Sequence, residues 1–258
     1  MTSASMPGPL LVFDFDGVIV DGMEEYWWSA RRAALRLAPS LHLPERAPAA
    51  FARLRPLIHK GWEMVLVAAE LAPPPAGPTG PSLIEAPDYA GALEPALARW
   101  NWTPSRLQME LEAVRSEALA QDRDAWLALH TFFPGVRRRL ESLAGEGAVW
   151  GVLTTKGGAF AAEILAAAGL KPAFVHGHEQ GSKPAVLAGL VGRGCPLWFL
   201  EDRRPTLEVV RATPGLETVR CLLVSWGYLG PQDQRGLEPL GIHWLTPERF
   251  ASPLADWP

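Results

Sequence analysis

The sequence contains little cysteine and little lysine. Its 258 residues include two cysteines, Cys195 and Cys221, which match no metal-binding spacing and are too few to build a disulfide-stabilised domain. Only four of the 24 basic residues are lysines, and these are Lys60, Lys156, Lys171 and Lys183. Arginine therefore carries the ordinary surface charge, and each lysine becomes a candidate for a more specific role.

Long apolar runs and clusters of positive charge are also missing. No apolar run approaches the ~20 residues of a membrane-spanning helix, and the N-terminal residues lack the basic and apolar regions of a signal peptide. A net charge of −4 without Lys/Arg-rich runs offers no surface for nucleic acid or for an anionic membrane. We therefore expect a soluble cytoplasmic protein that binds neither, with enough hydrophobic residues (48%) for a buried core.

Short apolar runs recur along the chain and predict the strands of a parallel sheet. The runs cover residues 10–15, 149–154, 173–176, 196–200, 219–224 and 242–245. They are continuous rather than alternating, as expected for strands that are buried on both faces. Helices are predicted between several of them, over residues 136–143, 159–168 and 185–191. This alternation is typical of a doubly wound, Rossmann-like α/β fold.

The alternation is interrupted between Asp21 and Pro134, where we find no convincing strand. Residues 23–37 carry apolar side chains at helical spacing, and Thr103 begins a second amphipathic helix. A Pro/Gly-rich stretch at residues 72–81 predicts a loop within this segment. Residues 22–131 therefore read as a helical cap domain, inserted after the first strand of an α/β core formed by residues 1–21 and 132–258.

Six of the eleven tryptophans lie in the predicted helical insert. Large aromatic side chains dominate hydrophobic cores, so we expect most of the six to build the core of the insert. The alternative is that one or two of them face a substrate cleft, and the sequence leaves both interpretations open.

Polar residues follow several of the predicted strands. They occur in four short segments, which are Asp14-Phe15-Asp16-Gly17, Thr154-Thr155-Lys156, Gly181-Ser182-Lys183-Pro184 and Glu201-Asp202. In an open parallel sheet, ligands bind beyond the carboxyl ends of the strands. Acids, a hydroxyl group and an ammonium group at that edge are the groups needed to hold a divalent metal ion and a phosphate.

The acids predict a metal site. Residues i and i+2 of an extended chain point to one side, so Asp14 and Asp16 are expected to converge. With Glu201 and Asp202 nearby, the carboxylates would repel one another unless a cation lay between them, and hard oxygen ligands favour Mg²⁺. The alternative is that Asp14 and Asp16 only cap a strand before a turn at Gly17, but the other polar strand ends argue against it.

These same segments resemble the motifs of the haloacid dehalogenase-like (HAD) superfamily. LLVFDFDGVIVDG closely resembles motif I, VLTTKG resembles motif II, GSKP resembles motif III and WFLED resembles motif IV, in the expected order. FFPGV resembles the segment that leads from the cap back into the core. The resemblance covers residues 8–22 and 132–226, and the helical insert lies where one HAD subclass carries its cap.

The resemblance implies a Mg²⁺-dependent phosphatase that acts on a small phosphorylated metabolite. Asp14 would be the nucleophile that forms an aspartyl-phosphate, and Asp16 would be the general acid and base. The metal would be held by the Asp14 carboxylate, the Asp16 backbone carbonyl and Asp202, with Glu201 as a further ligand. The phosphate would be held by Phe15, Gly17, Thr154, Thr155 and Lys183, with Thr154 and Lys183 stabilising the transferred charge.

Several alternatives stay open at this point. Thr154 would simply end a strand, and Lys183 would be a surface residue, if the motifs were coincidental. Lys156 is equally consistent with a structural contact and with a ligand contact. Thr155 and Thr206 depart from the family pattern, in which an Asn-like residue and a further acid are usual. Asp21 resembles the second acid of motif I and is expected to shape the flap that enters the cap.

Four other functions are weighed against a phosphatase. A sugar phosphomutase of the β-phosphoglucomutase kind shares the Glu201-Asp202 pair and the cap type. A non-catalytic binding module of the same fold would account for the two departures. Asp16 argues against a dehalogenase, which needs no general acid, and against a phosphonate-cleaving enzyme, in which Lys60 would have to form a Schiff base.

Overall fold

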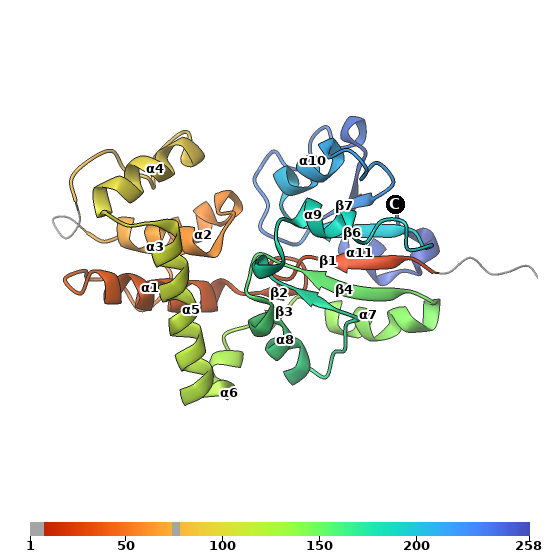
Figure 1. Ribbon diagram of the computed structural model, residues 1–258, viewed down its shortest axis with the longest axis horizontal. Helices are drawn as coiled ribbons and strands as arrows, with labels where there is room; N and C mark the ends of the chain where they lie inside the picture. The colour runs from red at the N-terminus through yellow and green to blue at the C-terminus, as the bar shows by residue number, and fades with distance from the viewer. Residues whose placement is uncertain (1–7, 74–77) are drawn as a thin grey trace, which may run out of the picture. The chain divides into compact units, whose positions relative to one another are not determined.

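The computed structural model describes residues 8–73 and 78–258, and its contacts divide the chain into two compact units (Figure 1). The first unit comprises Met1–Asp21 and Thr131–Pro258, and the second comprises Gly22–His130. The described residues of the predicted loop, on either side of 74–77, form no helix or strand. Residues 74–77 of that loop, and residues 1–7 of the N-terminal segment, lie outside the described residues.

The first unit is built from a parallel sheet with helices between the strands. Its strands are β1 Leu10–Phe13, β2 Val20–Asp21, β3 Thr131–Phe132, β4 Val149–Leu153, β5 Val175–His176, β6 Leu197–Glu201, β7 Arg220–Val224 and β8 Ile242–Leu245. Its α-helices are α7 Val136–Ser142, α8 Gly158–Ala167, α9 Lys183–Ala188, α10 Arg204–Ala212 and α11 Pro247–Ala251. Short 3₁₀ helices are η2 Leu143–Glu146, η3 His178–Gln180, η4 Glu238–Leu240 and η5 Leu254–Asp256.

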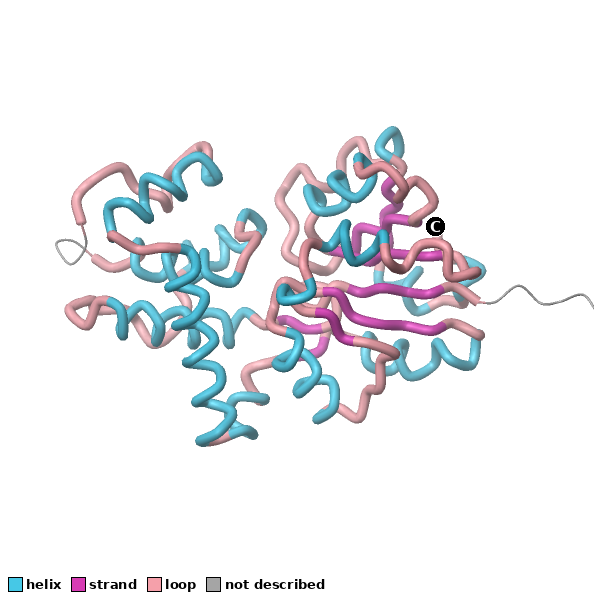
Figure 2. Tube along the Cα trace, in the orientation of Figure 1, coloured by secondary structure: helices cyan, strands magenta, loops and turns pink. Residues whose placement is uncertain are grey.

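The six-stranded sheet has the order β5-β4-β1-β6-β7-β8, and every pair of neighbours is parallel. Figure 2 shows the strands of this unit in magenta, with helices around them. All six predicted sheet strands are present, and the doubly wound α/β prediction is confirmed. Strand β1 lies at the centre, where Leu10 pairs with Val149 of β4 and with Leu197 of β6. The strands β4 and β5 are added on one side of β1, and β6, β7 and β8 are added on the other side, so the order of strand addition reverses beside β1. Such a reversal is the point where ligands bind in sheets of this kind.

Helices cover both faces of the sheet. Figure 1 shows α9 and α10 on one face, with α7 and α8 on the other. The face under α9 and α10 is packed by alternate residues of β1 and β6, including Leu10, Val12 and Phe199, together with Leu207 and Val210 of α10. Burial on both faces explains why these strands were recognisable as continuous apolar runs.

Strands β2 and β3 form a separate two-stranded antiparallel sheet. Val20 pairs with Phe132, and Asp21 pairs with Thr131. The sequence prediction of no strand between Asp21 and Pro134 is wrong at β3. A two-residue strand is too short to produce a recognisable hydrophobic pattern, since strand patterns are read over four or more residues.

The second unit is helical throughout its regular structure. Its helices are α1 Met23–Leu37, α2 Ala49–Leu54, η1 Arg55–Leu57, α3 Gly61–Glu70, α4 Tyr89–Trp100, α5 Pro104–Gln121 and α6 Arg123–Leu127. Helices α1, α3 and α5 pack against one another in pairs. Thr103 accepts a hydrogen bond from the Arg106 N–H and so caps α5, as its sequence predicts. In the described parts of the chain, no helix combines the length and the apolar character needed to cross a membrane.

A fully buried ion pair lies in the core of the helical unit. Arg115 of α5 donates two hydrogen bonds to the Glu25 carboxylate of α1, at 2.7 and 2.8 Å. The Ser29 hydroxyl also donates to Glu25, and His130 Nε2 lies 3.9 Å from the same carboxylate. The buried charge of Glu25 is therefore compensated by several neighbours from separate parts of the unit.

The two cysteines differ in exposure, and this difference predicts their reactivity. Cys221 is fully buried in β7, and burial raises the pKa of its thiol to about 12. Cys195 is partly exposed. Because the thiolate is the reactive form, we expect one thiol per chain to react with a disulfide reagent in the native protein, and two after denaturation. Replacing Cys195 with serine should remove the native reaction, and fast reaction of two native thiols would contradict the prediction.

Candidate active site

The polar residues that follow β1, β4 and β6 lie at neighbouring positions because these strands are adjacent in the sheet. Asp14 follows β1, Thr154 follows β4, and Glu201 and Asp202 stand at the end of β6. All four are buried, with between 1% and 7% of each residue exposed. Burial of several charged side chains at one edge of a sheet is costly unless they are paired, so their partners decide what the site can do.

Asp14, Glu201 and Asp202 form a cluster of carboxylates. Each offers an oxygen atom, and these oxygens lie within 4.8 Å of one another. Glu201 is held in place by three donors, because one of its oxygens accepts the backbone N–H groups of Asp202 and Arg203, both at 3.2 Å, while the other accepts Lys183. The structure therefore brings together the three carboxylates that the sequence predicts as metal ligands.

Lys183 stands between two of these carboxylates. Its ammonium group donates to Glu201 Oε2 at 2.6 Å and forms a second ion pair with Asp14 Oδ1 at 2.9 Å. Lys183 is the first residue of α9, where Ser182 caps the helix by accepting the Ala185 N–H and Pro184 occupies the first turn. This local structure brings a buried lysine to the acidic cluster.

The site carries more negative charge than Lys183 neutralises. Burial, and then the charge of Glu201, raises the pKa of Asp14 to about 7, although Lys183 opposes the shift. Burial also raises the pKa of Glu201. Burial would lower the pKa of Lys183, but the charges of Asp14 and Glu201 outweigh this effect and raise it. Lys183 is therefore held as an ammonium ion. Its single positive charge does not neutralise the carboxylates that surround it.

Asp16 has a different lysine as its partner. The side chain of Lys156 is buried, and its Nζ atom lies 3.6 Å from Asp16 Oδ1. Strand β1 ends at Phe13, and the Asp14 N–H still pairs with the Leu200 carbonyl of β6 at 2.8 Å. A turn follows, in which the Phe15 carbonyl accepts the N–H groups of residues 19 and 20, at 2.8 and 3.1 Å.

The predicted phosphate-binding residues are arranged as follows. Thr154 Oγ1 accepts the Lys156 N–H at 3.1 Å, which folds the segment after β4 into a tight turn. Thr155 is partly exposed, whereas the Phe15 side chain is fully buried, so only the backbone of Phe15 is available to a ligand. Gly17 has a positive φ of 91° and lies against Asp202. These placements leave the predicted phosphate contacts of all four residues as predictions.

The sequence interpretation leaves one feature of the site undecided and misses a second. Lys156 was left open between a structural and a ligand contact, but the scarcity of lysine and its place after a strand were usable signals. The second feature is the loop after β7, residues 225–228, whose Tyr228 N–H donates to Asp202 Oδ2 at 2.7 Å. The same rule about strand ends would have drawn attention to this loop.

The residues present fit a divalent metal ion. The donor set consists of hard carboxylate oxygens, as Mg²⁺ prefers. Among the described residues, the buried atoms Asp14 Oδ1 and Asp16 Oδ1 accept no hydrogen bond. Each of these two oxygens faces a lysine ammonium, but Asp14, Glu201 and Asp202 share the single ammonium of Lys183, so a metal ion would supply positive charge that this cluster lacks.

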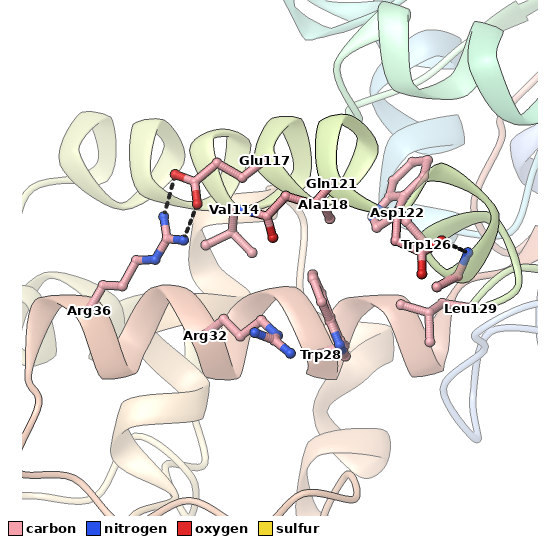
Figure 3. Close-up of a pocket in the computed structure, with 11 residues that line it drawn as sticks. Trp28, Arg32, Arg36, Val114, Glu117, Ala118, Gln121, Asp122, Trp126 and Leu129 are labelled. Atoms are coloured by element: carbon pink, nitrogen blue, oxygen red, sulfur yellow. Dashed lines mark hydrogen bonds and ion pairs between the residues drawn. The ribbon is translucent and has the colours of Figure 1, made fainter.

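A separate cavity of about 270 Å³ lies within the helical unit, between α1 on one side and α5 with the segment around α6 on the other (Figure 3). Trp28 and Trp126 line it, and Arg36 pairs with Glu117 across it. The Arg32 guanidinium lies 4.1 Å from the centre of the Trp28 ring. All of its lining residues belong to the helical unit, and the predicted site residues are not among them. Two of the tryptophans of the insert therefore form a cavity wall as well as packing against neighbours.

Comparison with solved structures shows that the chain has the fold of the haloacid dehalogenase-like hydrolases. A haloacid dehalogenase-like hydrolase from Streptococcus pneumoniae is similar over 95% of both chains, with 16% identity and a TM-score of 0.54. A predicted phosphoglycolate phosphatase from Haemophilus somnus 129PT is similar over 96% of this chain and 97% of its own, with 17% identity and a TM-score of 0.57. A provisionally assigned β-phosphoglucomutase from Thermotoga maritima matches over 94% and 96%, with 17% identity and a TM-score of 0.53. No protein-family model matches the sequence, and no curated protein is significantly similar to it.

Proposed function

We propose that this chain, which has the HAD fold, is a Mg²⁺-dependent phosphatase that hydrolyses the phosphate monoester of a small metabolite. The observation that carries the proposal is the buried cluster of Asp14, Glu201 and Asp202 with Lys183 between two of its members. A structural ion pair would need one acid and one base, whereas this cluster has an excess of acid at the sheet position where ligands bind.

The metal would be held by the carboxylates of Asp14 and Asp202 and by the backbone carbonyl of Asp16, with Glu201 as a further ligand. When bound, Mg²⁺ supplies charge that offsets the repulsion between a carboxylate nucleophile and a phosphate dianion. Glu201 already accepts three hydrogen bonds, one of them from Lys183. Glu201 therefore also positions the Lys183 ammonium beside Asp14.

The chain's own groups then account for both halves of the hydrolysis. A carboxylate oxygen of Asp14 attacks phosphorus, the bond from phosphorus to the alcohol oxygen breaks, and Asp16 gives that oxygen a proton. In the second half, Asp16 takes a proton from water, the water oxygen attacks phosphorus, and the aspartyl-phosphate bond breaks to release phosphate. Lys183 and Thr154 hold the phosphoryl oxygens, and Lys156 lies 3.6 Å from Asp16 Oδ1.

A metal-dependence assay tests this proposal. The purified chain should hydrolyse p-nitrophenyl phosphate and some members of a panel of phosphorylated metabolites with Mg²⁺, and activity should disappear with EDTA and return when Mg²⁺ is restored. Ca²⁺, which prefers more ligands and longer bonds, is a useful comparison and should support little turnover. A chain that binds Mg²⁺ but turns over no phosphate ester on the panel would contradict the proposal.

A sugar phosphomutase is the second candidate. It is favoured by the adjacent acids Glu201 and Asp202 and by the shared fold of the Thermotoga maritima protein. A mutase returns the phosphoryl group to a sugar hydroxyl instead of to water. It would therefore interconvert sugar phosphates with little release of inorganic phosphate, whereas a phosphatase releases one phosphate for each ester consumed.

A further inference from the structure

The loop after β7, residues 225–228, contacts two functional segments of the core unit. The Tyr228 N–H donates to Asp202 Oδ2 at 2.7 Å, and the Tyr228 hydroxyl donates to Asp21 Oδ1 at 2.6 Å. The indole N–H of Trp226 donates to the Val18 carbonyl at 3.0 Å. One short loop therefore bonds to a predicted metal ligand at the end of β6 and to the chain that follows Asp16.

Two glycines allow this close approach. A Cβ atom on Gly17 would lie 1.9 Å from Asp202 Oδ2, and the φ of Gly17 is positive. A Cβ atom on Gly227 would lie 2.3 Å from the Cβ of Asp202 and 2.4 Å from the Gly17 carbonyl oxygen. The Asp202 side chain is thus enclosed by the backbone of the loop after β1 and by the backbone of the loop after β7.

We propose that residues 225–228 act as a clasp that positions Asp202 for metal binding, with Tyr228 anchoring the clasp to Asp21. This inference rests on the proposed function. An amide N–H on one carboxylate oxygen restricts rotation of that carboxylate, and groups that orient metal ligands contribute strongly to affinity. The Tyr228 hydroxyl would act through Asp202, so Tyr228 is a positioning residue and not a catalytic one.

Asp21, to which Tyr228 anchors the clasp, lies where the chain leaves the core unit. Asp21 is the last residue of β2, and the helical unit begins at the next residue, Gly22. Its partner in β3 is Thr131, where the chain re-enters the core unit. Tyr228 therefore connects Asp202 to the two-stranded sheet through which the chain leaves and re-enters the core.

Metal affinity distinguishes positioning from general stabilisation. Mn²⁺ binding to the full chain can be followed by electron paramagnetic resonance and Mg²⁺ binding by calorimetry, with no substrate present. We expect Tyr228→Phe to weaken binding about tenfold, because the clasp loses its anchor while the N–H to Asp202 remains. Gly227→Ala should weaken binding by at least as much, because its methyl group would displace Asp202.

Tyr89→Phe is the matched control. Tyr89 also donates its hydroxyl to a buried carboxylate, that of Glu63 at 3.1 Å, but it lies in the helical unit. This variant should lose thermal stability without losing metal affinity. Unchanged Mn²⁺ affinity in both Tyr228→Phe and Gly227→Ala would overturn the clasp proposal. An equal loss of Mn²⁺ affinity in Tyr89→Phe would also overturn it. Failure of the parent chain to bind either metal would overturn the clasp and the proposed function together, whereas parental binding with unaffected variants overturns the clasp alone.

Discussion

Replacing Asp14 with asparagine is expected to abolish phosphate ester hydrolysis, with a fall in kcat of roughly 10⁴-fold or more. The amide has nearly the shape of the carboxylate but cannot act as the nucleophile that forms the aspartyl-phosphate. Steady-state turnover of p-nitrophenyl phosphate with saturating Mg²⁺ measures the effect.

The fold of this variant should be retained, because Asp14 is a carboxylate that burial already disfavours in its charged form. Lys183 keeps its bond to Glu201 and so is not left without a buried partner. Asp124→Asn makes the same chemical change at an exposed residue of the helical unit and should leave turnover unchanged. Substantial residual activity in a folded Asp14→Asn protein would refute the proposed mechanism.

The largest expected effect on stability comes from Glu25→Ala in the helical unit. Arg115 is almost fully buried, and this change would leave its guanidinium without its bidentate carboxylate partner. Removing one member of a buried ion pair typically costs about 3–5 kcal/mol. Urea unfolding followed by tryptophan fluorescence should show the loss, because Trp27 and Trp126 are buried in the same unit.

Two further variants separate the ion pair from other causes. Glu25→Leu combined with Arg115→Leu removes both charges, and this double variant should be more stable than Glu25→Ala because no buried charge remains unpaired. Glu117→Ala makes the Glu-to-Ala change on α5 at an exposed ion pair with Arg36 and should leave the unfolding midpoint almost unchanged. Equal stability of Glu25→Ala and Glu117→Ala would show that the buried pair contributes nothing.

The elements that the sequence predicts well are those with local signals. The apolar runs of β1 and β6 are recognisable because both faces of the sheet are covered, and α5 is recognisable from its cap at Thr103. The Glu25–Arg115 pair joins residues 90 positions apart, and no local pattern indicates which arginine a buried glutamate will meet. Pairing of that kind is decided by how α1 and α5 pack.

The candidate site likewise combines features that have local sequence signals with features that depend on tertiary structure. Asp14, Thr154 and the Glu201-Asp202 pair were predictable because they stand at or directly after strand ends, which meet at one edge of a parallel sheet. The convergence expected for Asp14 and Asp16 stays a prediction, since β1 ends at Phe13 and a turn begins with the Phe15 carbonyl, which accepts the Ile19 N–H. The burial of Lys156 and its approach to Asp16 depend on the turn after β4, which propensity alone does not specify.

The central place of β1 means that its two neighbours in the sheet are synthesised long after β1 itself. Leu10–Phe13 emerges first, yet both of its neighbours, β4 and β6, come from beyond the helical unit. At typical rates of synthesis, about 10–40 s separate the emergence of β1 from that of β6. The helical unit is contained within residues 22–130, so all the helices that pack against one another in it are synthesised before β4 and β6 can complete the sheet around β1. Strand β1 is thus the first strand of the sheet to be made, but it gains both of its neighbours only after β6 has emerged.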